Sequence, residues 1–324
     1  METSSCTELN FDQFFSLLID FPDKYKEEKV GCGSYYDVYK AVLQLDKDHT
    51  GKEYAIRYPK SILGAQEQRN FFREIQCHYS LKHEAIVPLV GFSLPGQHND
   101  KYAIITEYMP NSTLNNLIKL VNVGSAMENW ETIKAINIFG IAAGMAYIHQ
   151  QNIIYRDLKP ENILLDENYY PKISGFDLSK PFKQGTENDI EQTVNIGTPL
   201  YMAPEICDDT HYSNKIDVYS YALTLYEILT TNKPFYDIEK CTIFKLFSLI
   251  NQGQRPTIRD GEIPECFVEL LIKCWNANSV ERPSFKQIVK GFVDHKELFF
   301  NFDLVNKEEF NKYVDKAIKN LDLS

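Results

Sequence analysis

The stretch IIYRDLKPENILLD, residues 153–166, decides the fold of this chain of 324 residues. It holds Asp157, Lys159 and Asn162 in one short segment between two apolar runs. An aspartate can accept a proton from a hydroxyl group, a lysine can contact a phosphate, and an asparagine can ligate a metal ion. A string of this length rarely arises by chance, so the spacing of the three residues predicts a site that handles phosphates.

A glycine-containing turn lies upstream, in VGCGSYYDVYK at residues 30–40. Gly31 and Gly33 stand between two β-rich runs, and without a Cβ their backbone N–H groups can approach phosphate oxygens closely. The same pattern also fits an ordinary structural hairpin. Both interpretations stay open at this point.

The bulk composition is that of an ordinary folded protein, with 44% hydrophobic and 24% charged residues. The net charge of -11 argues against a general nucleic-acid or anionic-membrane binder. The seven cysteines are odd in number and form no C-x-x-C pair, which favours a reduced, cytoplasmic setting. No apolar run reaches the roughly 20 residues of a membrane helix, and the first residues lack a signal-peptide pattern. We therefore expect no nucleic-acid or membrane partner; a protein partner or protein substrate is expected only through the family resemblance described below.

The pattern along the chain predicts an α+β fold with two lobes. Strands are expected at residues 29–45, 52–59, 86–94 and 101–109, with an amphipathic helix over 65–83. After a hinge at 107–111 the chain reads as mostly helical, most clearly at 131–150 and 215–230. FDQFFSLLIDF at 11–21 predicts a helix with Phe11, Phe14, Phe15 and Leu18 on one face, docked on the body or held for a partner. The tail at 307–321 carries a helical stripe of Phe310, Val314, Ala317, Ile318 and Leu321.

These motifs together resemble the protein kinase family from about Tyr25 to Asp294. The resemblance implies a kinase-like domain at 23–294, with an N-lobe at 23–107 and a C-lobe at 112–294. Terminal helical extensions would occupy 1–22 and 295–324. TEYM at 106–109 and KCWNANSVERPSF at 273–285 look most like the tyrosine-kinase-like group, while Lys159 fits a serine/threonine-type catalytic loop. The remaining matches are the glycine loop at 31–38, YAIR at 54–57, Glu74 in REI, YMAPE at 201–205, Asp217 in KIDVYSYA, and the pair Glu205–Arg282.

The resemblance also implies a nucleotide pocket and assigns its residues. The glycine loop, from Val30 through Gly31 and Gly33, would cover the phosphates, and Glu74 would pair with the basic residue of the YAIR strand. Asp157 would accept the substrate hydroxyl's proton. Asn162 would hold magnesium together with the aspartate of the family's Asp-Phe-Gly motif. The base would lie among Val38, Ala55, Leu164, the gatekeeper Thr106, and the backbone groups of Glu107 and Met109. The alternative for these last residues is plain core packing, so ATP binding stays open.

Two positions of the N-lobe depart from the family pattern. Tyr36 takes the place of the third glycine, where a bulky ring can fold over the phosphates or plug their site. Arg57 takes the place of the strand lysine. It keeps the charge, but a planar guanidinium does not replace a compact ammonium at a tight phosphate site.

The third departure is Gly175, in PKISGFDLSK at 171–180. Aligned without gaps, Gly175 stands where the metal-binding aspartate belongs, which leaves Asn162 alone and argues against magnesium binding. Asp177 lies about 6.5–7 Å further along an extended chain, too far for bonds of about 2.0–2.1 Å. A two-residue slip would bring Asp177 into place and give Leu178 the packing role of Phe176. We expect the unslipped register, with Tyr155 packing beside Phe176.

Two functions follow. The first is a pseudokinase, a binding, scaffold or regulatory module with little or no phosphotransfer, in which Asp157 and Lys159 are remnants. The second is an active or weakly active serine/threonine kinase that uses Asp177 in the slipped register. Thr193 is the expected site of any regulatory phosphate, with Arg156 as its partner, although an unmodified loop residue fits equally well.

Overall fold

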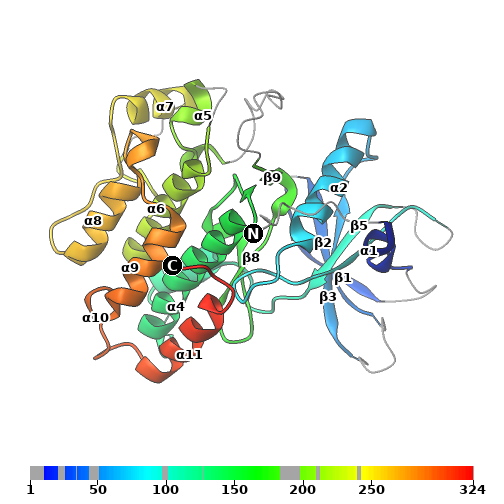
Figure 1. The fold of residues 1–324 in the computed structure, drawn as a ribbon, viewed down its shortest axis with the longest axis horizontal. Helices are drawn as coiled ribbons and strands as arrows, with labels where there is room; N and C mark the ends of the chain where they lie inside the picture. The colour runs from blue at the N-terminus through cyan, green and yellow to red at the C-terminus, as the bar shows by residue number, and fades with distance from the viewer. Residues whose placement is uncertain are drawn as a thin grey trace. The chain divides into compact units, whose positions relative to one another are not determined.

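A computed structural model describes residues 11–20, 26–33, 35–43, 51–96, 101–125, 127–182, 198–208, 212–238 and 242–323. The contacts divide the chain into two units (Figure 1). The N-lobe comprises Met1–Lys82 with Val87–Pro110, and the C-lobe comprises His83–Ile86 with Asn111–Ser324. One unit is built on a β-sheet and the other mainly on helices, which confirms the α+β fold class.

The N-lobe is organised by a five-stranded sheet with the order β1-β2-β3-β5-β4. Every neighbouring pair runs antiparallel, as the alternating runs and the polar turn at 46–52 predict. The strands are β1 (Glu27–Cys32), β2 (Tyr36–Val42), β3 (Glu53–Pro59), β4 (Leu89–Ser93) and β5 (Ala103–Glu107).

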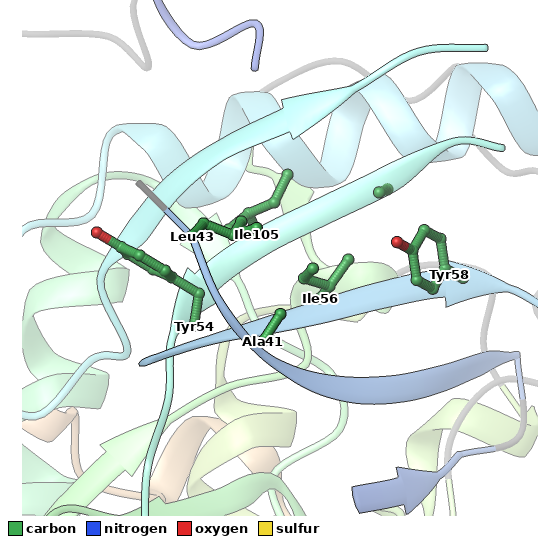
Figure 2. Packing of buried hydrophobic residues seen from close by; sticks show 7 residues of the cluster. Ala41, Leu43, Tyr54, Ile56, Tyr58 and Ile105 are labelled. Atoms are coloured by element: carbon green, nitrogen blue, oxygen red, sulfur yellow. The ribbon is translucent and has the colours of Figure 1, made fainter. Parts of the chain in front are cut away.

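The two faces of this sheet carry different side chains because residues alternate along each strand. One face holds an apolar cluster, drawn in Figure 2, of Ala41, Leu43, Tyr54, Ile56, Tyr58, Ala103 and Ile105. The opposite face carries Val38 across from Arg57 and Ala55 across from Thr106. Opposed residues of antiparallel strands share a face, so the candidate nucleotide residues of the N-lobe lie together.

Helix α2 (Ala65–Tyr79) packs on the part of that second face formed by β4 and β5. Its buried Phe71 and Ile75 pack against Phe92 of β4 and Ile104 of β5. Ile104 is the β-sheet partner of Arg57, so the helix also brings Glu74 to the strand that carries Arg57. The helix ends four residues before the predicted limit of 83, where the Ser80 hydroxyl donates to the Cys77 carbonyl.

The N-terminal segment is only partly helical. Helix α1 (Phe11–Ser16) ends at Ser16, and the next residues form a parallel bridge from Leu18 to Phe92 on the edge strand β4. Ile19 N–H donates to the Phe92 carbonyl at 2.8 Å, and Phe92 N–H donates to the Leu17 carbonyl at 2.9 Å. The prediction of a helical face that includes Leu18 is therefore wrong, because the open edge of β4 offers these residues backbone partners that a helix cannot use at the same time.

The C-lobe is built around two long helices, α4 (Trp130–Gln150) and α6 (Lys215–Thr230). Nearly every residue of both is buried, as expected for helices that are apolar on all sides. No helix in the described ranges is long and apolar enough to cross a membrane. The other helices are α3 (Leu114–Asn122), α5 (Glu205–Asp208), α7 (Ile243–Asn251), α8 (Glu265–Cys274), α9 (Phe285–Asp294), α10 (Lys296–Phe299) and α11 (Lys307–Ile318).

Helix α11 carries Phe310, Val314, Ala317 and Ile318 of the stripe predicted for the tail, while Leu321 lies beyond its last residue, Ile318. Phe310, Val314 and Ala317 are fully buried, and the Phe310 ring lies 5.9 Å from the ring of Phe139 on α4. The His83 ring donates from Nε2 to the Ala317 carbonyl at the end of the helix, 2.7 Å away. Burial lowers the pKa of His83 to about 4, so the ring is neutral near pH 7 and its Nε2–H donates.

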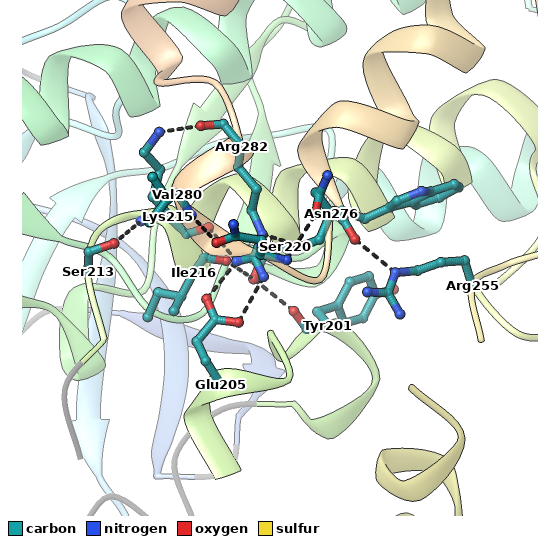
Figure 3. Close-up of polar contacts among 12 residues, drawn as sticks. Tyr201, Glu205, Ser213, Lys215, Ile216, Ser220, Arg255, Asn276, Val280 and Arg282 are labelled. Carbon is teal, nitrogen blue, oxygen red and sulfur yellow. Dashed lines mark hydrogen bonds and ion pairs between the residues drawn. The ribbon is translucent and has the colours of Figure 1, made fainter. Parts of the chain in front are cut away.

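Arg282 is the largest fully buried side chain of the C-lobe (Figure 3). Its guanidinium donates to both carboxylate oxygens of Glu205, at 2.6 and 2.8 Å, and to the carbonyls of Asn276 and Lys215. It also lies over the Tyr219 ring, 5.1 Å from the centroid. A buried charge of this kind needs all its donors satisfied, and here one residue connects α5, α6 and the loop after α8.

Replacement of Gly91 by alanine should release the N-terminal segment. A Cβ on Gly91 would overlap the Leu17 carbonyl and lie 2.7 Å from Ile19 Cδ1, so the two backbone bonds to Phe92 cannot both survive. We expect Gly91→Ala to cost about 1–3 kcal/mol of unfolding free energy. Faster hydrogen exchange at the Ile19 amide would identify the cause. Gly96→Ala is the control, since its Cβ meets nothing closer than 3.8 Å, and equal effects from both variants would contradict the expectation.

Loss of the buried guanidinium should destabilise the C-lobe strongly. Arg282→Met leaves Glu205 and two carbonyls without their donors, and we expect a cost of about 3–5 kcal/mol in urea unfolding. Arg255→Met is the matched control, because Arg255 contacts the same Tyr219 ring and donates to carbonyls without meeting a carboxylate. The interpretation is wrong if the two variants lose the same stability.

Candidate functional site

The glycine turn of the N-lobe forms the β1–β2 hairpin. Gly31 pairs with Val38, and Gly33 N–H donates to the Tyr36 carbonyl at 2.8 Å. Val30, at an irregularity in β1, is partly exposed. The two glycines have no positive φ, so the backbone itself does not require glycine here. Their lack of a side chain matters for how closely something can approach the hairpin.

The residues expected around the base lie where β3 and β5 pair. Ala55 is opposite Thr106, and both are buried, as is Met109 just after β5. Glu107 uses its backbone N–H on the Pro88 carbonyl, at 3.1 Å, and its carboxylate pairs with Lys52. This leaves the Glu107 carbonyl and the Met109 backbone as the groups to consider for a base.

Arg57 lies in a closed network with two other side chains. Its Nη1 donates to Glu74 Oε1 at 2.6 Å, so the expected ion pair with the α2 glutamate is present. The Tyr36 ring covers the guanidinium, with 4.4 Å from Arg57 Cζ to the ring centroid. The Tyr36 hydroxyl donates to Glu74 Oε2 at 3.2 Å, which holds the ring in place. The bulky residue in the third glycine's position therefore folds over the residue in the strand lysine's position.

In the C-lobe, Asp157, Lys159 and Asn162 meet as the sequence predicts. Lys159 Nζ and Asn162 Nδ2 each donate to Asp157 Oδ2 at 2.7 Å. Lys159 Nζ also donates to Thr198 Oγ1 at 2.6 Å. Asn162 ends the 3-10 turn η1 (Pro160–Asn162), and strand β7 (Ile163–Leu165) follows with Leu164 bridged to Thr113.

The Asp157 carboxyl has a raised pKa. Burial is the largest cause, since it disfavours the charged form, and the negative charge of Asp177 raises the pKa further. The charge of Lys159 and the hydrogen bonds from Lys159 and Asn162 act in the opposite direction. The Asp157 carboxyl therefore holds its proton to a higher pH than an exposed aspartate does, and Asp177 lies within electrostatic reach.

A buried carboxylate from α6 holds the segment before Asp157. Asp217, fully buried, accepts from the backbone N–H of Tyr155 at 2.9 Å and of Arg156 at 2.8 Å, and lies 2.8 Å from His149 Nε2. The sequence identifies Asp217 only by its place in a family motif. Its position among apolar residues near the start of α6 is the signal for its role, because a buried acid must find hydrogen-bond donors.

Gly175 lies directly against Asn162. Strands β7 and β8 (Pro171–Ile173) pair in continuous register, with Ile163 opposite Ile173, and Ser174 N–H donates to the Asn162 carbonyl at 2.9 Å. A Cβ on Gly175 would lie 3.3 Å from Asn162 Cγ. The backbone therefore follows the unslipped register.

Asp177 belongs to the next turn, η2 (Phe176–Leu178). Phe176 is fully buried and packs edge-to-face on Tyr155, with 5.4 Å between the ring centroids. The Tyr155 hydroxyl donates to the Ser174 carbonyl. Phe176 thus fills the apolar position that the slipped register would give to Leu178.

Arg156 has positive φ, and its side chain donates to the Leu178 carbonyl at 2.6 Å and to the Tyr212 hydroxyl at 2.7 Å. Thr193, its expected phosphorylated partner, lies outside the described residues. The contact between them stays a prediction.

The sheet-based N-lobe, the helical C-lobe and the Asp157–Lys159–Asn162 arrangement are those of one family, and comparison with known proteins gives the same result. The protein kinase domain matches residues 25–293, and the chain belongs to the protein kinase family. The cysteine-rich receptor-like protein kinase 45 of Arabidopsis thaliana is 31% identical over 306 residues, 90% of this chain and 82% of the relative.

Two further relatives are longer than this chain. The dual specificity protein kinase shkB of Dictyostelium discoideum is 30% identical over 267 residues, 82% of this chain but 39% of the relative. The serine/threonine-protein kinase STY17 of Arabidopsis thaliana is 28% identical over 287 residues, 88% of this chain and 47% of the relative. The chain therefore spans less than half the length of these two relatives.

The electrostatic coupling at Asp157 can be measured directly. Asp177→Asn should lower the pKa of Asp157, because a negative charge is removed, and Lys159→Met should raise it, because the stabilising cation is lost. Carboxyl carbon shifts followed against pH give both values, with the exposed turn residue Asp303→Asn as the control.

The same shift predicts a pH dependence of stability. The native state binds the Asp157 proton more tightly than the unfolded state does. The stabilisation from protonated Asp157 is therefore present below the ordinary value of about 3.9 and is lost as pH rises toward the native pKa. Unchanged titration of Asp157 in Asp177→Asn would contradict the proximity of the two carboxylates.

Proposed function

We propose that this protein kinase domain is a pseudokinase, a binding, scaffold or regulatory module with little or no phosphotransfer. The observation that carries the proposal is the position of Gly175, packed against the Asn162 amide in a strand pair of continuous register. The residue that should supply a carboxylate beside Asn162 has only a hydrogen there.

The residues present do not fit a magnesium site of the family type. Magnesium requires near-octahedral oxygen ligands at about 2.0–2.1 Å and is held in such enzymes by one or two carboxylates. Asn162 brings an amide, and its Nδ2 is committed to Asp157. Gly175 brings no ligand.

Arg57 supports the same proposal from the N-lobe. Its charge is paired with a carboxylate that is 1% exposed, and its face is covered by the Tyr36 ring. A guanidinium is a planar fork, so it does not deliver a compact positive charge to phosphate oxygens as a lysine ammonium would. The internal ion pairs Arg57–Glu74 and Glu205–Arg282 are present. The metal-binding carboxylate is missing at Gly175, and the basic residue of β3 is covered by a ring.

An active serine/threonine kinase is the second candidate, and one observation favours it. Asp157 keeps both its lysine and its asparagine partner, and Asp177 stands close enough to shift its pKa. Under this alternative a rearranged segment would bring Asp177 to Asn162. That movement would have to withdraw Phe176 from its buried position against Tyr155.

The setting and the partner class extend the proposal. The described cysteines, Cys32, Cys77, Cys266 and Cys274, carry free thiols, which supports a reduced cytoplasmic setting. The kinase fold implies protein partners or substrates in general, and we propose that this domain acts by binding another protein.

Phosphotransfer and magnesium-dependent thermal stabilisation by ATP separate the two candidates. We expect the wild type to transfer phosphate at background rates. Asp177→Asn should leave both the phosphotransfer rate and the thermal stabilisation by ATP unchanged. The triple variant Arg57→Lys, Gly175→Asp, Asp177→Gly should exceed the wild-type rate by at least about a hundredfold, because it restores groups that stabilise transition-state charge.

Gly175→Ala in the same background is the matched control. It adds the same Cβ at a φ of 71° without adding a carboxylate. Aspartate tolerates this left-handed conformation better than most residues, so the restored side chain is compatible with the backbone. Magnesium-dependent stabilisation and activity in the wild type, both lost in Asp177→Asn, would overturn the pseudokinase proposal.

A further inference from the structure

The Tyr36 ring lies on the face of the N-lobe sheet that carries the candidate base residues. Val38 is two residues along β2 from Tyr36 and directly opposite Arg57. Ala55 is two residues along β3 from Arg57 and opposite Thr106. Side chains two apart on a strand share a face, separated by about 7 Å. A ligand that starts over Ala55 and extends along β3 therefore reaches Arg57 and the ring above it.

The ring removes one face of the guanidinium from any ligand. A distance of 4.4 Å from Arg57 Cζ to the ring centroid is a stacked contact that leaves no space for a phosphate oxygen between them. The edge of the guanidinium carries the 2.6 Å bond to Glu74. The Tyr36 hydroxyl bonds the same carboxylate, so moving the ring also breaks a hydrogen bond to a buried acid.

In the β1–β2 hairpin, a backbone N–H that could bind a phosphate oxygen already donates a hydrogen bond within the turn. Gly33 N–H points back to the Tyr36 carbonyl at 2.8 Å and closes the turn. Glycine-rich turns bind phosphates through such amides, directed at the ligand. Here the same residue, Tyr36, accepts the amide with its carbonyl and covers Arg57 with its ring.

The residues at the other end of this face remain suited to a flat, uncharged ring. Ala55 is small, Thr106 and Met109 are buried, and the Glu107 carbonyl and the Met109 backbone are the polar groups next to them that could contact a base. The two ends of the face therefore differ. The end at Ala55 and Thr106 carries residues suited to a base, and at the other end the Tyr36 ring covers Arg57.

We infer that the N-lobe face takes a purine nucleoside, a base with its sugar and no phosphates, in preference to ATP, and that Tyr36 sets this specificity. The inference rests on the proposed function, since a chain that bound magnesium would neutralise the phosphates by another route. Under that proposed function, the purine nucleoside is a ligand that the domain binds and does not use as a phosphate donor.

The test is calorimetric titration of the full chain with adenosine and with ATP, each with and without magnesium. We expect the wild type to bind adenosine at least tenfold more tightly than ATP, with no effect of magnesium. Tyr36→Gly should strengthen ATP binding about tenfold or more and leave adenosine binding within about threefold, since a tenfold change corresponds to the 1.4 kcal/mol scale of one uncovered charged contact.

Two variants separate the ring from other effects. Tyr36→Phe keeps the stacked ring and loses only the hydroxyl, so its preference for adenosine should persist. Tyr35→Gly introduces the same loop freedom at a neighbouring tyrosine that is 62% exposed, and should leave the ratio of the two affinities unchanged.

The wild-type measurement decides the inference even where a variant does not fold. ATP binding equal to or tighter than adenosine binding, or no adenosine binding at all, would overturn it. Equal affinity ratios in the wild type and a folded Tyr36→Gly would remove the role of Tyr36. Tight ATP binding without phosphotransfer would contradict only the preference for a nucleoside. Phosphotransfer by the wild type would contradict the pseudokinase proposal.

Discussion

The buried carboxylate of Asp217 is the constraint on which the C-lobe site depends. A fully buried aspartate is costly unless its oxygens receive hydrogen bonds, and here the donors are the backbone amides of Tyr155 and Arg156. This fixes the backbone just before Asp157, including the positive φ of Arg156. It also places the Tyr155 ring against Phe176, and so connects α6 to the segment that begins at Gly175.

The contacts that hold the fold together are different from the groups that would bind a ligand or a metal. The Asp217 bonds, the Tyr155–Phe176 contact and the Glu205–Arg282 pair need no ligand, because every partner belongs to the C-lobe itself. The same holds for the Arg57–Glu74 pair in the N-lobe. A chain can therefore keep the family's internal contacts while losing the carboxylate that only a metal requires. Retained motifs such as Asp157 and Asn162 are evidence of a maintained shape, and evidence of catalysis has to come from the ligand-facing groups.

Much of this could be predicted from the sequence, for identifiable reasons. The family resemblance predicted Val38 and Ala55 on one side of a base, and ungapped flanks on both sides of Gly175 predicted the register of β8. The end of α1 was not predictable locally, because Leu17–Ile19 leave the helix for the edge of β4, some seventy residues away in sequence. The direction of the Tyr36 ring was equally hidden, since it depends on Arg57 and Glu74 meeting from different elements. Long-range partners overrode local propensity in both cases.

The order Gly175-Phe176-Asp177 has a physical consequence for stability. Position 175 has φ 71° and ψ 60°, a left-handed conformation that costs a residue with a Cβ roughly 1–2 kcal/mol and costs glycine little. A Cβ there would also press against Asn162. For folding alone, glycine is thus the better residue at this position, and an aspartate is justified only by the metal it holds. Phe176 keeps its buried place in either order. Where metal binding does not constrain this position, the fold itself therefore favours glycine.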